Sequence, residues 1–126
     1  MKKKISTPNA PAAIGPYSQA VLAGDTLYIS GQIPLNPATG EMAGDTIETQ
    51  AEQVFQNLNA ILTEAGMGFE DVVKAIVLLA DIGDFAKVNE IYGKYLCGET
   101  LPARAAFAVK ALPKGALVEI EMIAVR

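Results

Sequence analysis

The stretch VKAIVLLA, residues 73–80, decides how this chain folds, because it is apolar on both of the faces that a β-strand presents. Only Lys74 interrupts the apolar run, and residues 105–109 show the same two-sided pattern. Strands that alternate apolar and polar residues need cover on one face, whereas strands apolar throughout need cover on both. We therefore expect a sheet with two buried faces.

Two helices are predicted to cover one of these faces. Residues 46–65 carry apolar side chains at three- and four-residue spacing, with Asp45 as the expected N-cap and Gly66 where a helix end favours a left-handed residue. A shorter helix is expected from after Asp84 to about Leu96. Because two helices cover only one face, we predict that copies of the same chain bury the other, in an obligate homo-oligomer.

The remaining strands are predicted from apolar and β-branched runs between turn residues. With 72–80, they lie at residues 19–23, 26–30, 105–110 and 117–125, and a short strand is expected near residues 3–5. A chain of 126 residues falls in the usual size range of single domains. We therefore expect one domain over residues 1–126.

The composition excludes several classes of function. The chain is 51% hydrophobic and 19% charged, with a net charge of −4 and no stripe of basic residues, so we expect a globular protein that does not bind nucleic acid. The absence of histidine excludes imidazole catalysis, and with only one cysteine, Cys97, we expect no metal site and no internal disulfide. Cys97 is expected to be a partly buried structural residue.

The sequence also bears on location. No apolar run approaches the roughly 18 residues that span a bilayer. The basic segment at residues 1–9 lacks the apolar region that follows the first part of a signal peptide. We expect a soluble protein of the cytoplasm with no membrane partner.

Arg104 is one of only two arginines, the other being Arg126, and it stands alone in the apolar run of residues 101–109. A permanently charged, planar group in such a run is costly unless it meets an anion of matching shape. One candidate is a buried ion pair with Glu119 or Glu121. The other is a bound anion, with Arg104 as its receptor.

Glu119 and Glu121 share one face of the strand predicted at residues 117–125, because side chains alternate between the faces of a strand. They could lie on a solvated face, paired with a lysine. Alternatively, a hairpin closed by residues 112–115 could bring Glu119 beside the strand of Arg104. That arrangement would place an anion receptor and an acid/base group in one cleft.

Three motifs carry a resemblance to a known family. They are Pro102-Ala103-Arg104 followed by Leu112-Pro113 and Val118-Glu119-Ile120-Glu121, the N-terminal segment at residues 9–20, and Ser30-Gly31-Gln32-Ile33-Pro34. With this order and spacing, the chain resembles the RidA/YjgF family of small reactive-intermediate deaminases over essentially its whole length.

The resemblance implies a chorismate-mutase-like α+β fold, with a mixed sheet and two helices on one face, assembled as a homotrimer with ligand sites between subunits. It implies hydrolysis of 2-imino acids and their enamine tautomers, such as 2-aminoacrylate/2-iminopropanoate and 2-iminobutanoate, to 2-oxo acids and ammonia. Pyridoxal-phosphate dehydratases release these compounds from serine and threonine, which implies a functional link to those enzymes. This chemistry requires neither a metal nor another cofactor.

The resemblance also implies roles for individual residues. Arg104 would bind the substrate carboxylate bidentately. Glu119 would hold and deprotonate the attacking water, which favours a partly buried carboxylate with a raised pKa. Tyr17 would donate to the substrate or orient the water, and the alternative for its ring is packing against a neighbouring subunit.

Three further positions are carried over as substrate-binding residues. The backbone N–H after Ser30, at Gly31, would contact the carboxylate, and the alternative for this glycine is a bulge or tight bend. Asn89 would be a polar group near the cleft, and the alternative is a solvated helix face. Ala106 stands where many relatives have cysteine, so thiol-dependent behaviour is not expected here.

Two other functions compete with the deaminase. A non-catalytic protein could use the same cleft to bind a small 2-oxo acid, although the presence of both Arg104 and Glu119 favours an enzyme. Inhibition of translation or RNA cleavage, also attached to this family, is disfavoured by the acidic chain without histidine or a basic patch.

Overall fold

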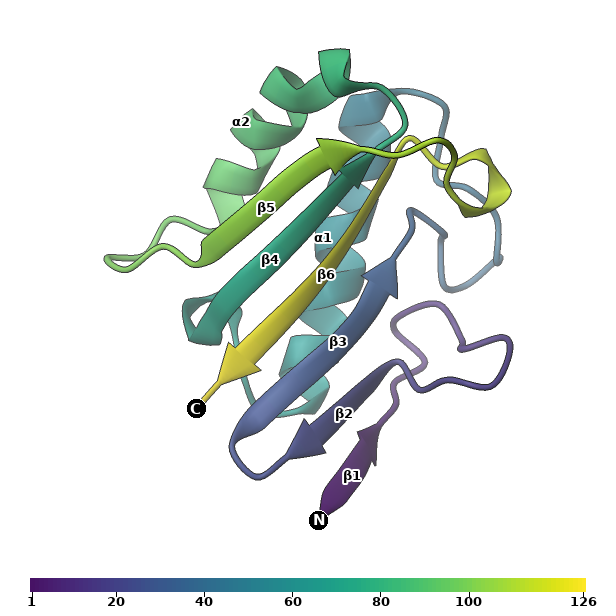
Figure 1. The fold of residues 1–126 in the computed structure, drawn as a ribbon. Helices are drawn as coiled ribbons and strands as arrows, with labels where there is room; N and C mark the ends of the chain where they lie inside the picture. The colour runs from purple at the N-terminus through teal and green to yellow at the C-terminus, as the bar shows by residue number, and fades with distance from the viewer.

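The apolar strand predicted at residues 72–80 forms β4 (Val72–Leu79), inside a sheet of six strands. The structure is a computed structural model that describes residues 1–126. The other strands are β1 (Lys2–Ile5), β2 (Ala20–Ala23), β3 (Thr26–Gln32), β5 (Ala103–Ala108) and β6 (Val118–Val125). The sheet order is β1-β2-β3-β6-β4-β5, and β4 and β5 form its one parallel pair (Figure 1).

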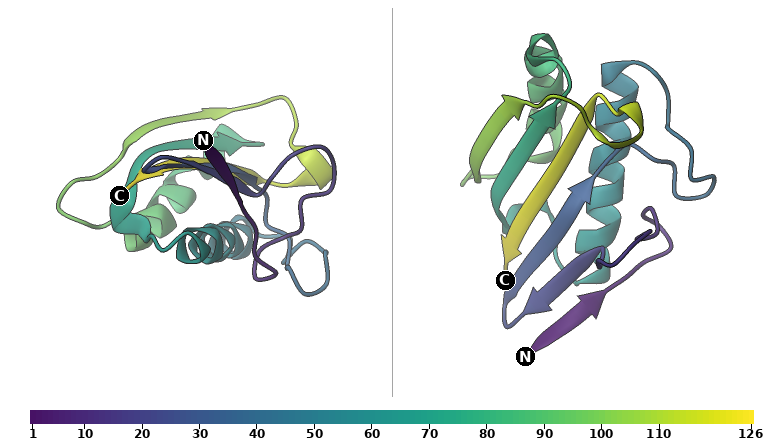
Figure 2. Two further views of the ribbon diagram at one scale, coloured as in Figure 1. Left: turned by 90° about the horizontal axis from the view of Figure 1, so that it is seen from below. Right: turned by 45° about the vertical axis from the view of Figure 1, so that its right-hand side comes forward.

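Two helices, α1 (Ile47–Glu64) and α2 (Phe85–Tyr95), lie on the same face of this sheet (Figure 2). The predicted α+β architecture, with one mixed sheet and two helices on one face, is therefore confirmed. Neither helix combines the length and the apolar character that crossing a bilayer requires.

The apolar face of α1 forms the centre of the core. Phe55, Leu58 and Ile61 are fully buried and belong to the same apolar cluster as Val77 of β4 and Ile120 of β6. Burial of these large side chains stabilises the pairing of helix and sheet by about 1.5–3 kcal/mol for each of them. The three- and four-residue spacing seen in the sequence is the spacing of this buried face.

The two ends of α1 differ in how well they were predicted. Asp45 is not the N-cap, because the helix begins at Ile47 and the extended backbone of Thr46 lets its hydroxyl accept a hydrogen bond from Thr49 N. The end at Gly66 is confirmed. Its φ is +74°, and Met67 N donates to Leu62 O at 2.9 Å, as in a Schellman motif.

The face of the sheet away from the helices is left open in this chain. In β4, Ala75 and Val77 are buried under the helices, whereas Ile76 and Leu78 point the other way and remain partly exposed. Tyr28 is 51% exposed and Phe107 is 47% exposed, although both are large and hydrophobic. The helices therefore cover one face only, as expected.

Strand β5 departs from the prediction. It was expected to be buried on both faces, but it is an edge strand paired only with β4, and both Arg104 and Phe107 are exposed. The expected hairpin between β5 and β6 is also wrong, because β4 lies between these two strands. The connection crosses the end of β4, where Val109 N donates to Leu79 O at 2.9 Å.

Candidate functional site

The predicted site residues form two groups that lie on opposite faces of the sheet. Tyr17, Ser30, Gly31 and Glu119 lie around the end of β3, and we call them the acidic half-site. Arg104 and Asn89, joined by Phe85 and Tyr92, lie between β5 and α2, and we call them the arginine half-site.

The register of the central strands explains this separation. Residues directly opposite each other on paired strands point to the same face. Arg104 is opposite Ala75, which is buried under the helices, whereas Glu119 is opposite Leu78, which points to the open face. The expected cleft in which Arg104 and Glu119 meet within one chain is therefore wrong.

Arg104 also forms no ion pair within the chain, which excludes the alternative of a buried pair with Glu119 or Glu121. Its Nη1 instead donates a hydrogen bond of 2.6 Å to Oδ1 of Asn89. Its Cζ lies over two rings, 5.2 Å from the centroid of Phe85 and 4.8 Å from that of Tyr92. The guanidinium is thus held by an amide and two aromatic rings.

The contacts of Phe85 and Tyr92 with Arg104 were not predicted from the sequence. The signal was present, because residues 85, 89 and 92 follow the four- and three-residue spacing of one helix face. The ring of Tyr92 packs edge-on against Phe55 with centroids 5.9 Å apart. Burial raises the pKa of Tyr92, and Arg104 acts in the opposite direction.

The acidic half-site is built around Glu119, which is half-buried on the open face. Burial raises the pKa of Glu119, and the negative charge of Glu121 on the same face raises it further. Its carboxylate lies against the backbone of Gly31, where an added methyl group would overlap it.

Gly31 lies in a β-bulge of β3, since the pairing with β6 shifts between Ile29 and Gln32. The bulge that was one interpretation of this glycine is therefore confirmed, whereas a contact between its N–H and a substrate carboxylate stays a prediction. The bulge is present, and the missing side chain leaves the space that the carboxylate of Glu119 takes.

Tyr17 lies on the loop between β1 and β2 and is 54% exposed. The loop is fixed to β3 because Ser30 Oγ donates to Ser18 O at 2.6 Å. Tyr17 and Gly31 line one cavity of about 280 Å³, together with Ile14 and Ile33. The structure therefore brings Tyr17, Ser30, Gly31 and Glu119 into one neighbourhood.

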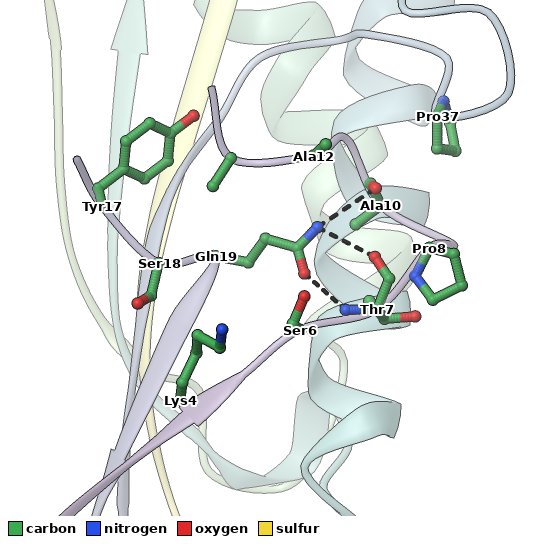
Figure 3. A pocket seen from close by; sticks show the side chains of 11 residues that line it. Lys4, Ser6, Thr7, Pro8, Ala10, Ala12, Tyr17, Ser18, Gln19 and Pro37 are labelled. Atoms are coloured by element: carbon green, nitrogen blue, oxygen red, sulfur yellow. Dashed lines mark hydrogen bonds between the residues drawn. The ribbon is translucent and has the colours of Figure 1, made fainter. Parts of the chain in front are cut away.

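Gln19 organises the other side of this loop and was not singled out from the sequence. It is 4% exposed, and its Oε1 accepts a hydrogen bond from Thr7 N at 2.7 Å (Figure 3). Its Nε2 donates to the carbonyls of Thr7, Ala10 and Pro11. Tyr17 and Gln19 line both a cavity of about 650 Å³ and the cavity of about 280 Å³.

Cys97 takes no part in either half-site. It is exposed, and the expectation that it is partly buried is wrong, because α2 ends at Tyr95 and Leu96 occupies the buried position instead. The structure holds no group of three His, Cys, Asp or Glu side chains placed to bind a metal ion.

Comparison with known proteins gives full-length matches. The family model described as Endoribonuclease L-PSP matches residues 7–126. The mouse 2-iminobutanoate/2-iminopropanoate deaminase is 55% identical over 100% of this chain and 93% of its own length.

Two solved structures are similar throughout. The Rid family protein YyfA of Yersinia pestis has a TM-score of 0.97 at 48% identity, with 100% of both chains covered. TdcF of E. coli with bound serine has a TM-score of 0.92 at 43% identity, with 98% of each chain covered.

Substitution of Gly31 tests the geometry of the acidic half-site. In Gly31→Ala, the added methyl group displaces the carboxylate of Glu119 toward solvent, so the pKa of Glu119 falls toward the ordinary glutamate value. NMR titration of the glutamate carboxyl carbons measures this shift. Gly93→Ala is the control, because its added methyl group meets nothing within 4 Å. An unchanged pKa of Glu119 in Gly31→Ala would contradict the described packing.

Proposed function

The chain belongs to the Endoribonuclease L-PSP family, also called RidA/YjgF, and we infer that it is a deaminase of reactive 2-imino acids. The mouse relative is named for 2-iminobutanoate and 2-iminopropanoate, and it matches this chain from end to end at 55% identity. The chain accordingly hydrolyses such imines, and their enamine tautomers, to 2-oxo acids and ammonia.

The arginine half-site supports a role for Arg104 as receptor for the substrate carboxylate. A guanidinium has five N–H donors, and only one of those of Arg104 is used, by Asn89. No carboxylate of the protein neutralises its charge. A 2-imino acid carries a carboxylate that such a fork binds in its plane. Serine, the ligand of TdcF, carries a carboxylate as well.

The acidic half-site supports a role for Glu119 in the hydrolytic step. As the oxygen of a bound water bonds to C2, the C=N electron pair moves to nitrogen, and Glu119 takes a proton from the water. Glu119 returns that proton to nitrogen, which gives a carbinolamine. Glu119 then moves the proton of the new hydroxyl group to nitrogen as the C–N bond breaks, so that ammonia leaves and the C2–O bond becomes the carbonyl of the 2-oxo acid. A carboxylate whose pKa is raised toward the working pH suits these transfers.

The neighbours of Glu119 complete this half-site. In this proposal the phenol of Tyr17, which lines the same cavity as Gly31, orients the water or donates to the substrate. The N–H of Gly31, in the bulge after Ser30, contributes a further donor to the substrate carboxylate.

These roles require two copies of the chain, because the two half-sites lie on opposite faces of one sheet. We propose that the arginine half-site of one subunit meets the acidic half-site of the next, in a chorismate-mutase-like homotrimer with three intersubunit sites. A repeated contact that joins two different surfaces forms a ring when its rotation closes, and a rotation of one third of a turn closes with three copies. The open apolar face, with Tyr28 and Phe107, supports burial between copies.

The remaining properties follow from this activity. We propose that residues 1–126 act as one domain without a cofactor, in the cytoplasm, on imines released from serine and threonine by pyridoxal-phosphate dehydratases. A net charge of −4 and the absence of histidine favour small-molecule hydrolysis over RNA cleavage.

The activity is tested by supplying threonine and a threonine dehydratase, with semicarbazide to trap the free imine. The wild-type protein should speed formation of 2-oxobutanoate at the expense of the semicarbazone. Arg104→Ala should lose the activity together with 2-oxobutanoate binding. Glu119→Gln should lose about 10²-fold or more in turnover while still binding 2-oxobutanoate. Binding of 2-oxobutanoate by a wild-type protein without any acceleration would instead indicate a non-catalytic binding protein.

The pH dependence of kcat/KM tests the role of Glu119. As the pH falls through its pKa, Glu119 becomes protonated and can no longer accept a proton, so kcat/KM falls on the acid side. The raised pKa places this fall at a higher pH than an ordinary glutamate would. Glu121→Gln removes a charge that raises the pKa, and should shift the fall to lower pH. The control Glu64→Gln, on α1, should leave the pH of the acid-side fall in kcat/KM unchanged. An equal shift in both variants would count against Glu119 as the base.

The molar mass in solution tests the assembly. Light scattering at micromolar concentration should give about three times the chain mass of 13.3 kDa, as a closed ring of three requires. A mass equal to that of one chain would rule out the proposed assembly.

A further inference from the structure

We propose that one face of α2 positions the guanidinium of Arg104 for the substrate through contacts that are all uncharged, so that its positive charge is kept for the incoming carboxylate. The three positioning residues are Phe85, Asn89 and Tyr92. This inference rests on the deaminase function proposed above and adds residues that act through Arg104.

The spacing of the three residues produces a notch on α2. Residues 85 and 92 are about two helical turns apart on one face, and Asn89 lies between them. Cζ of Arg104 is 5.2 Å from the ring centroid of Phe85 and 4.8 Å from that of Tyr92, so the guanidinium lies over both rings. Asn89 Oδ1 then accepts one of its N–H groups at 2.6 Å.

Arg126, the other arginine of the chain, differs from Arg104 because it is paired with a carboxylate. Arg126 is paired with Asp25, with Nε and Oδ1 3.9 Å apart, whereas Arg104 has no carboxylate oxygen within the 4.0 Å of an ion pair. A carboxylate in place of Asn89 could orient the guanidinium equally well, but it would also neutralise it. The amide accepts the hydrogen bond without cancelling the charge.

The rings of Phe85 and Tyr92, like the amide of Asn89, hold the guanidinium without neutralising its charge. An aromatic ring attracts a guanidinium through its π face, and this contact leaves the N–H groups at the edge of the guanidinium plane available. A carboxylate binds bidentately at that edge. Rings and substrate therefore use different parts of Arg104 and do not compete.

Tyr92 contributes its ring and not its hydroxyl. The residue is 8% exposed, and its hydroxyl oxygen is buried without a hydrogen-bond partner. The ring is held in place by its packing against Phe55. A phenylalanine at position 92 should therefore position Arg104 as well as the native tyrosine does.

Asn89→Asp tests whether the absence of charge matters. The two side chains have the same shape, but aspartate places a carboxylate at hydrogen-bond distance from Nη1 of Arg104. We expect KM for the imine and Kd for 2-oxobutanoate to rise about tenfold or more, with a much smaller change in kcat. Asn89→Ala leaves the positive charge of Arg104 without a neighbouring carboxylate, and it should raise KM and Kd by about threefold. Equal binding by Asn89→Asp and the wild type would overturn the proposal.

Substitutions of Phe85 and Tyr92 test whether the two rings position Arg104. Phe85→Leu and Tyr92→Leu should each raise KM and the Kd of 2-oxobutanoate by about three- to tenfold, while Tyr92→Phe should keep wild-type values. Tyr95→Leu is the matched control, because Tyr95 lies on the same helix and stacks on Phe55 at 4.8 Å without contacting Arg104. It should lower the stability and leave KM unchanged. An equal rise in KM for Tyr95→Leu would mean that loss of packing explains the effect, which overturns the proposal.

The two proposals fail in different ways. If the wild type shows no deaminase activity, the proposed function fails, and the Kd of 2-oxobutanoate still decides whether the α2 residues position Arg104. If the wild type is active and the Asn89 and ring variants leave both KM and Kd unchanged, only the positioning proposal fails.

Discussion

The register across β5, β4 and β6 is the constraint on which the rest of the structure depends. It turns Arg104 toward α2 and Glu119 toward the open face, so a single chain cannot bring the proposed anion receptor and the proposed base to one substrate. A shift of one residue between β4 and β6 would turn Glu119 to the opposite face, but it would also move Val77 or Ile120 out of the core. Burial of these residues therefore fixes the face on which Glu119 lies.

The surroundings of each half-site set the charge of Arg104 and the pKa of Glu119. Arg104 is held by an amide and two rings, which leave its charge uncompensated. Glu119 is half-buried against Gly31 and close to a second carboxylate, which raises its pKa. A 2-imino acid bound between two copies would neutralise Arg104 with its carboxylate and place C2 near the water held by Glu119. In the proposed assembly, the separation of the two groups within one chain is what allows them to meet between two chains.

Local patterns allowed much of this to be predicted from the sequence. The apolar spacing of α1, the two-sided apolar character of β4 and the alternation of Glu119 with Ile120 all persist in the structure. The errors concern contacts between distant segments. The parallel pairing of β5 with β4 depends on packing over the whole sheet, so a hairpin with β6 was expected instead. The partner of Arg104 was missed for the same reason, since Asn89 lies fifteen positions away on a helix.

The central claim is that one site takes Arg104 from one chain and Glu119 from another. It is tested most directly by co-assembling Arg104→Ala chains with Glu119→Gln chains in equal amounts, each variant alone being inactive. In a closed ring with random assortment, about a quarter of the sites receive both native residues, so about a quarter of the wild-type activity should return. Mixed assemblies, verified by mass, that remain as inactive as the separate variants would contradict the account.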